Sequence, residues 1–269
     1  ALAANLGKAT PEDFARAIMT TDAFHKISHR EVSLPGGVVK LVGMAKGAGM
    51  ICPNMATMLS VVLCDAQVEA SVWQKMLRDA VELTFNRVTV DGDTSTNDTL
   101  YGLANGASGV SASDQESLKA LSAALTSVLG DLAYMLVKDG EGASKVARIH
   151  VAGAASDADA ERVARTVGHS QLVKTALYGR DANWGRIVAA VGRSGADFNP
   201  DDVVVTLCGV ELFRKGQPTE LDFDALLEEP LKQRDLPIDI VLGSGSGSYT
   251  LLASDLGHEY VNVNADYRS

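Results

Sequence analysis

The sequence predicts an α+β fold, in which helices and strands form layers without alternating strictly along the chain. Two observations support this class. Segments with helical spacing of apolar residues dominate the chain before residue 165, whereas short β-rich runs dominate the part that follows. The order of the segments also lacks the regular strand–helix alternation of a doubly wound sheet. With 269 residues, 46% of them apolar, the chain can bury one or two substantial cores.

The first part of the chain contains clear start and turn signals. Thr10, followed by a proline and two acidic residues, is typical of a helix N-terminus, and this helix is expected to end near Met19. Two β-rich runs within residues 31–46 flank a Pro-Gly-Gly turn and predict a hairpin. A buried strand over residues 57–66 and an amphipathic helix over residues 68–86 are expected to follow.

The middle and the end of the chain differ in texture. The expected middle elements are a strand at 88–90, a polar segment at 91–98, two helices of which the second is long, capped by Ser111 or Ser113 and ends near Gly140, a strand at 146–152 and a helix at 158–178. Beyond them, β-rich runs are expected at 186–191, 203–212, 238–242, 251–252 and 260–263, with one helix at 223–232 and a flexible connection at 243–248. The change predicts a domain boundary near residue 165, which gives domains at 1–165 and 166–269.

Composition excludes several classes of function. The formal net charge of −10 makes nucleic-acid binding improbable, because an acidic surface repels phosphates. Apolar stretches such as residues 58–64 are too short to span a bilayer, and no basic-then-apolar leader precedes them, so no membrane association is expected. Three widely spaced cysteines indicate reduced thiols in a cytoplasmic protein. The histidines show no metal spacing, and the segment 91–98 lacks the glycine and glutamate of a calcium loop, so no metal is expected.

The segment of residues 46–59, KGAGMICPNMATML, contains the first candidate for chemistry. It lacks the Gly-Lys-Ser/Thr end of a phosphate loop and precedes a strand instead of a helix. It places the hydroxyl of Thr57 at the start of a buried strand, directly after Ala56. Such a hydroxyl could attack the Ala56 carbonyl, cut the chain, and then use the freed α-amine as its base, since that amine has a reference pKa of about 7.7–8.0. On composition alone, a purely structural threonine is the stronger alternative.

This same segment resembles the processing site of the ornithine acetyltransferase family, the bifunctional ArgJ-type enzymes. Five further segments match in the expected order: AIMTTDAF at 17–24, FNRVTVDGDTSTNDTL at 85–100, LVKDGEGASK at 136–145, GRDANWGRI at 179–187 and EYVNVNADYRS at 259–269. The likeness extends along nearly the whole chain. The family usually has a proline where this chain has Ala182.

The resemblance implies both a fold and an activity. The fold is an N-terminal-nucleophile-like αββα sandwich of the ArgJ and DmpA type with a smaller C-terminal α/β domain. The activity is a ping-pong acetyl transfer, in which N-acetylornithine acetylates a threonine and glutamate takes the acetyl group to give N-acetylglutamate. No cofactor is required, and acetyl-CoA remains open as a second acetyl donor. Arginine biosynthesis is the implied pathway, and the cleaved chains assemble as an α2β2 heterotetramer.

The resemblance also assigns residues to the site. Thr57 is the nucleophile, and Ala56 and Thr57 flank the cleavage site, so that the α chain ends at Ala56 and the β chain starts at Thr57. The implied substrate-binding residues are Thr20, Lys46, Thr57, Glu141, Asn264 and the C-terminal Ser269. Whether Thr20 or its neighbour Thr21 contacts substrate stays open. An ammonium suits Glu141 and a carboxylate suits Lys46, as binding of an α-amino acid requires.

Two alternatives remain beside this hypothesis. One is an N-terminal-nucleophile aminopeptidase or amidohydrolase of the same fold, although those enzymes typically use serine. The other is an uncleaved, non-catalytic homologue that serves as a binding or scaffold protein. The oxyanion-stabilising Thr-Gly pair of the family is expected to lie before residue 1. These 269 residues alone are therefore expected to show little activity.

Overall fold

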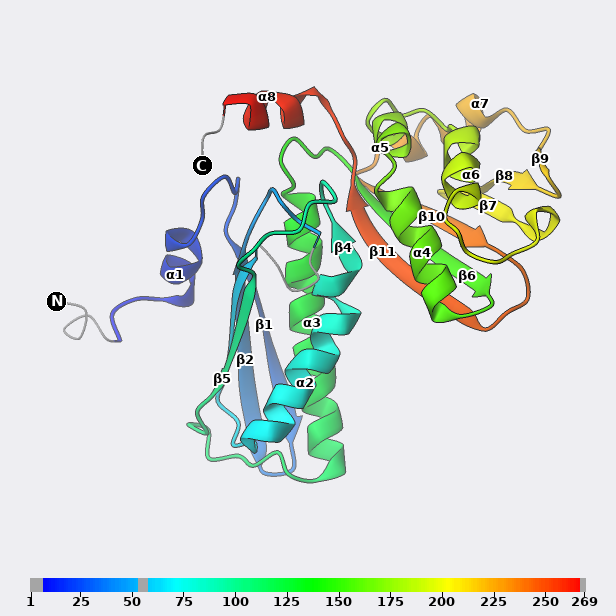
Figure 1. The fold of residues 1–269 in the computed structure, drawn as a ribbon. Helices are drawn as coiled ribbons and strands as arrows, with labels where there is room; N and C mark the ends of the chain where they lie inside the picture. The colour runs from blue at the N-terminus through cyan, green and yellow to red at the C-terminus, as the bar shows by residue number, and fades with distance from the viewer. Residues whose placement is uncertain (1–6, 53–57, 267–269) are drawn as a thin grey trace. The chain divides into compact units, whose positions relative to one another are not determined.

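The protein consists of two compact units (Figure 1). The structure is a computed structural model that describes residues 7–52 and 58–266. Unit 1 comprises Ala1–Val88 and Asp93–Gly140, and unit 2 comprises Thr89–Gly92 and Glu141–Ser269. The boundary expected at residue 165 falls inside a helix of unit 2, α4 (Asp157–Gly168), and the two units are of nearly equal length. The change from helical to β-rich sequence near residue 165 thus comes later than the boundary between the two units after Gly140.

Unit 1 is built on a four-stranded sheet with the order β1-β2-β3-β5. The strands are β1 (Lys26–Leu34), β2 (Gly37–Lys46), β3 (Leu59–Cys64) and β5 (Thr99–Ala104). The pairs β1–β2 and β2–β3 are antiparallel, whereas β3 and β5 run parallel. The helices of this unit are α1 (Pro11–Ala17), α2 (Ala70–Leu83) and α3 (Gln115–Lys138), with a 3-10 turn at Phe85–Arg87. Within the described residues, unit 1 contains one of the two sheets that an αββα sandwich requires.

Helices α2 and α3 cover one face of this sheet, as Figure 1 shows. Leu121, Leu125 and Leu129 of α3 are fully buried there. Gly43 of β2 permits the close approach, because a Cβ at this position would lie 2.6 Å from Val128 and 2.9 Å from Leu132. Among the described residues, α3 is the one helix long and apolar enough to cross a membrane by length and composition. Its leucines instead form the core of unit 1.

Unit 2 is built on a seven-stranded sheet with the order β4-β11-β6-β10-β7-β8-β9. The strands are β4 (Val88–Thr89), β6 (Val146–Ala154), β7 (Val204–Leu207), β8 (Val210–Arg214), β9 (Gln217–Pro218), β10 (Asp235–Val241) and β11 (Gly247–Ser254). Strand β10 runs parallel to β6 and antiparallel to β7. The helices are α4, α5 (Gln171–Tyr178), α6 (Trp184–Gly192), α7 (Phe223–Leu227) and α8 (His258–Asp266), with 3-10 turns at Pro200–Asp202 and Pro230–Lys232. Helix α4 packs on β6 and β11 through Val163 and Val167.

The local signals of unit 1 are confirmed. Thr10 caps α1 in a capping box with Asp13, as the Thr-Pro-acid pattern predicts. The hairpin is β1–β2, with Leu34 paired to Gly37 across the turn. Helix α2 buries Trp73, Met76 and Val81 on one face.

Several sequence-based assignments are wrong, each for a physical reason. The first helix expected after residue 98 is strand β5, which is held by its parallel pairing with β3, a contact that no local pattern shows. The long helix is capped by Asp114 instead of Ser111 or Ser113. The helix expected at 158–178 is two helices, because Ser170 caps a new one.

The β-rich runs expected at 186–191 and 260–263 are helices α6 and α8. In α6, Asn183 accepts a hydrogen bond from the Arg186 backbone N–H, and Ile187, Ala190 and Val191 are buried at helical spacing. The docked final strand expected before the C-terminus is therefore a helix within the described residues.

Overpacking at Gly43 should destabilise unit 1. We expect Gly43→Val to lower the free energy of unfolding by ~1–3 kcal/mol, because the new methyl groups would overlap Val128 and Leu132. Gly130→Ala in α3 is the matched control, since a Cβ there meets nothing closer than 3.8 Å. It should stabilise the helix by ~1 kcal/mol. Urea denaturation measures both changes, and equal stabilities of the two variants would contradict the packing at Gly43.

Candidate functional site

Two of the residues assigned to the substrate meet in unit 1. Lys46 is the last residue of β2, and its Nζ donates a hydrogen bond of 2.8 Å to Oγ1 of Thr20, which follows α1. Thr20 is exposed and Lys46 is half-buried, so both groups remain accessible to a small molecule. The hydroxyl that Lys46 reaches belongs to Thr20 and not to its neighbour Thr21.

A buried ion cluster supports this pair. The ammonium of Lys26, with no exposed surface, lies 2.6 Å from Oδ1 of Asp22 and 2.5 Å from Oδ2 of Asp139. Asp22 also accepts hydrogen bonds from the backbone N–H groups of Gly47, at 2.7 Å, and Thr20, at 3.1 Å. The Asp22 carboxylate therefore binds both the backbone of Thr20 and the backbone of Gly47, which directly follows Lys46.

The pKa values of the two carboxyl groups in this cluster are shifted in opposite directions. Burial acts to raise the pKa of Asp22, but the Gly47 N–H and the Lys26 ammonium hold it below its usual value. Burial raises the pKa of Asp139 by more than the Lys26 ammonium lowers it. Asp22 is accordingly the better partner for the single positive charge. Asp139 also accepts from the backbone N–H of Ala23, so it anchors the end of α3 to the start of the hairpin.

The second pair of assigned residues meets in unit 2. Nδ2 of Asn264, in α8, donates to Oε2 of Glu141 at 2.8 Å and to the Tyr260 carbonyl at 2.9 Å. Gly142 makes this approach possible, because it has φ +70° and a Cβ there would lie 2.5 Å from the backbone nitrogen of Tyr260. The pair therefore depends on a glycine directly after the glutamate.

Asp255 fixes the segment that carries Glu141. Its carboxylate accepts hydrogen bonds from the backbone N–H groups of Ser144, at 2.8 Å, and Lys145, at 3.0 Å, and from the Ser144 hydroxyl at 2.5 Å. Because Asp255 directly follows β11, these bonds tie the chain after Glu141 to the chain before α8. No sequence pattern predicted the roles of Asp22, Lys26, Asp139 and Asp255. Asp22 and Asp139 stand inside two of its recognised segments, at 17–24 and 136–145.

Three assigned residues lie outside the described part of the chain. They are Ala56 and Thr57, at the expected cleavage junction, and Ser269. The polar segment that follows β4 contacts the chain on both sides of the junction. Thr94 Oγ1 donates to the Cys52 carbonyl at 2.9 Å, and the Thr99 N–H donates to the Met58 carbonyl at 2.8 Å.

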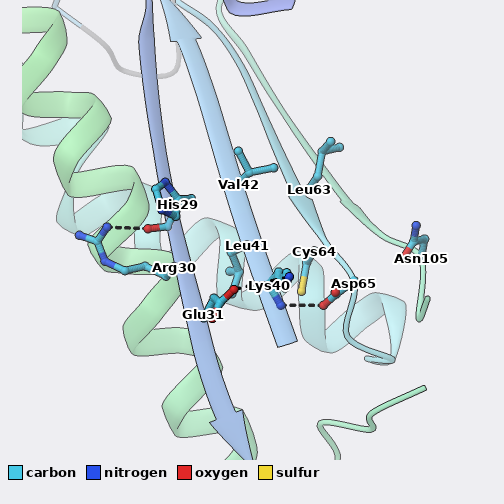
Figure 2. A pocket seen from close by; sticks show the side chains of 10 residues that line it. All are labelled: His29, Arg30, Glu31, Lys40, Leu41, Val42, Leu63, Cys64, Asp65 and Asn105. Atoms are coloured by element: carbon cyan, nitrogen blue, oxygen red, sulfur yellow. Dashed lines mark hydrogen bonds and ion pairs between the residues drawn. The ribbon is translucent and has the colours of Figure 1, made fainter. Parts of the chain in front are cut away.

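Two pockets of unit 1 are lined entirely by described residues, none of which is an assigned residue. One pocket of about 290 Å³ lies on the sheet face opposite α3, and Figure 2 shows the residues around it. There, the backbone N–H of Lys40 donates to Asp65, beside Val42 and Leu63. A second pocket of about 500 Å³ lies between α1 and the same face, against Tyr101 and Leu103. Neither is lined by Thr20 or Lys46.

Several titratable side chains outside the two residue pairs are buried. The three cysteines are free thiols, as the sequence predicts, and Cys52 and Cys64 are buried. Lys174 of α5 is buried and donates to carbonyls of Val90 and Ser254, and burial lowers its pKa to about 8. Among the described residues, no group of three or more His, Cys, Asp or Glu side chains is arranged to hold a metal ion.

Comparison with known proteins identifies the family. The model of the ArgJ family matches residues 1–269. The chain belongs to the ArgJ family. It is 73% identical over 268 residues to the arginine biosynthesis bifunctional protein ArgJ of Nitratidesulfovibrio vulgaris, with 100% of this chain and 68% of the relative covered. It is 48% identical over 260 residues to the protein of the same name from Desulfotalea psychrophila, with 96% and 66% covered.

The fold agrees with that of an ArgJ structure. The crystal structure of an arginine biosynthesis bifunctional protein ArgJ from Bacillus halodurans matches with a TM-score of 0.72 and 36% sequence identity. The match covers 76% of this chain and 96% of the other. The predicted α+β class and the ArgJ resemblance are therefore confirmed. The chain spans about two thirds of the length of the curated ArgJ relatives that it matches.

Removal of the Lys26 ammonium should destabilise the protein, because it leaves the carboxylates of the ion cluster buried without a counter-charge. In Lys26→Met, two buried carboxylates lose their shared partner, so we expect a loss of ~3–5 kcal/mol in the free energy of unfolding near pH 7. The loss should shrink as the pH falls, because protonation neutralises Asp22 and Asp139. Chemical denaturation at several pH values measures both effects. Lys119→Met, an exposed lysine on α3, should change stability little, and an equal loss in this control would contradict the assignment.

Proposed function

We propose that this chain is part of a self-cleaving acetyltransferase of arginine biosynthesis, which moves an acetyl group from N-acetylornithine to glutamate. Membership of the ArgJ family along residues 1–269 is the observation that carries this proposal. The names of the relatives point to the same pathway. The proposed reaction takes place in the cytoplasm.

Threonine chemistry accounts for both steps of the proposed reaction. The Thr57 hydroxyl attacks the Ala56 carbonyl, and hydrolysis of the resulting ester leaves Thr57 as a new N-terminus. The free α-amine then accepts the hydroxyl proton while the hydroxyl attacks the acetyl group of N-acetylornithine. Ornithine leaves, and the α-amino group of glutamate takes the acetyl group from the threonine ester. Acetyl-CoA is not required for this cycle.

The two residue pairs suit the two charges of an α-amino acid. Lys46, supported by Thr20, offers an ammonium to a substrate carboxylate. Glu141, held by Asn264, offers a carboxylate to a substrate ammonium. The proposal assigns binding to these four residues and to Ser269, and chemistry to Thr57. It further assigns the cleaved chains to an α2β2 heterotetramer.

Intact mass spectrometry of the full-length protein tests the nucleophile. We expect the wild type to consist of two fragments, one that ends at Ala56 and one that begins at Thr57. Brief exposure to N-acetylornithine should add the mass of one acetyl group to the Thr57 fragment, and glutamate should remove it. Thr57→Ala should stay uncleaved and unmodified, because it lacks the attacking hydroxyl. An uncleaved wild type would support a non-catalytic homologue, and acetate release without transfer to glutamate would support a hydrolase.

Charge removal at Lys46 and Glu141 tests substrate binding. We expect Lys46→Met and Glu141→Gln each to lower kcat/KM by about 10–100-fold, as loss of a charge-assisted hydrogen bond of ~1.5–3 kcal/mol implies. Self-cleavage should proceed in both variants. Lys40→Met, an exposed lysine on the same strand β2, is the matched control and should retain wild-type kcat/KM. Steady-state kinetics with N-acetylornithine and glutamate measure these values. Wild-type kcat/KM in both site variants would remove these residues from the site.

A further inference from the structure

One face of helix α5 holds the segment that connects β11 to α8 (Figure 1). Lys174 and Tyr178 stand four positions apart in α5, so their side chains lie on the same face of the helix. The Lys174 ammonium donates to the Ser254 carbonyl and, at 3.2 Å, to the Ser254 hydroxyl. The Lys174 carbonyl accepts the backbone N–H of Leu256 at 3.3 Å. Helix α5 therefore holds the chain between the end of β11 and the start of α8.

Tyr178 makes the last contact of this face. Gly257 rests against its ring, since a Cβ at Gly257 would lie 2.3 Å from the nearest ring atom. His258 is the first residue of α8, and its ring meets the Tyr178 ring edge-on, with the centroids 5.8 Å apart and the planes at 70°. This edge-on arrangement is a favourable geometry for two aromatic rings. Tyr178 therefore supports the point at which α8 begins.

Helix α8 has no packed face that could fix its direction. None of its residues is buried, and Val261 is 63% exposed. The close approach of Tyr260 to Gly142 lies in the first turn of the helix, next to the contact with Tyr178. The direction of α8 therefore depends on contacts made by its first turn.

Asn264 lies near the far end of α8, where small changes in direction have a large effect. It follows His258 by six residues, which places it about 9 Å further along the helix axis. A tilt of about 10° at the start of α8 would move Asn264 by about 1.6 Å over that length. The 2.8 Å hydrogen bond from Asn264 to Glu141 does not tolerate such a displacement. The position of the first turn therefore decides whether this bond forms.

We propose that Tyr178 is a positioning residue for the Glu141–Asn264 pair, an inference that rests on the function proposed above. The Tyr178 ring seats the start of α8, and the helix then places Nδ2 of Asn264 on Oε2 of Glu141. This hydrogen bond orients the Glu141 carboxylate toward the ammonium of an amino-acid substrate. Tyr178 acts on substrate binding through Asn264.

Steady-state kinetics of the full-length protein measure this role. Asn264→Ala should lower kcat/KM by about tenfold or more, as loss of a hydrogen bond to a charged group implies. Tyr178→Ala should lower it by a similar factor, mainly through a higher KM, because the pair binds substrate and takes no part in the chemical step. Tyr178→Phe keeps the ring and should retain most of the wild-type kcat/KM. Leu172→Ala, which truncates an exposed apolar side chain of the same helix, is the matched control and should retain all of it.

Hydrogen–deuterium exchange reports on α8 independently of activity. In Tyr178→Ala, the backbone amides of residues 258–266 should exchange at least about tenfold faster, because the helix loses its support. The amides of α4 and the melting temperature should stay close to those of the wild type. His258→Ala removes the other ring from an exposed position and should also speed exchange in α8, whereas Leu172→Ala should not. Unchanged exchange of α8 in Tyr178→Ala would overturn the inference.

A double-mutant cycle separates positioning from a general structural effect. If Tyr178 acts through Asn264, the variant that combines Tyr178→Ala with Asn264→Ala should have the kcat/KM of Asn264→Ala alone. Losses that multiply in the double variant, or a wild-type KM in Tyr178→Ala, would overturn the inference and leave the proposed acetyl transfer intact. Absence of acetyl transfer by the wild type would overturn both.

Discussion

The buried ammonium of Lys26 is the interaction on which the geometry of unit 1 depends. It connects Asp22, which precedes the hairpin, with Asp139, which caps the end of α3 and lies 113 positions after Lys26. A buried charge is tolerated only where its partners are in place, so the three segments have one compatible arrangement. Through the Gly47 N–H, this arrangement also fixes the end of β2, where Lys46 meets Thr20. The buried ion cluster thus determines where Lys46 and Thr20 lie.

In unit 2, a carboxylate that accepts hydrogen bonds from the backbone, instead of a buried ion cluster, holds the segment next to Glu141. Asp255 accepts two backbone N–H groups and a hydroxyl from Ser144 and Lys145, and thereby holds the segment after Glu141. Gly142 then lets the backbone at Tyr260 approach within a distance that any Cβ would forbid. A single carboxylate satisfies several orphan donors of an irregular segment in each unit. Irregular chain next to a site requires such support, since it has no ladder of its own.

Local signals in the sequence were sufficient for elements whose cause is local. The capping box at Thr10 and the hairpin turn after Leu34 involve residues a few positions apart. Strand β5 could not be predicted, because its cause is the parallel pairing with β3 some forty residues earlier. Helix α6 was mistaken for a strand because its valines and isoleucine favour strands, although its buried positions follow helical spacing. The ion cluster was missed for the same reason as β5: its members are distant in sequence.

Two of the recognised segments contain an assigned residue together with residues that position it. The segment at 17–24 carries both Thr20 and the Asp22 carboxylate that accepts the Thr20 N–H. The segment at 136–145 carries Asp139 and Glu141, followed by the glycine and backbone donors that the glutamate requires. A resemblance based on such segments therefore includes residues that make supporting hydrogen bonds as well as the residues assigned to the site.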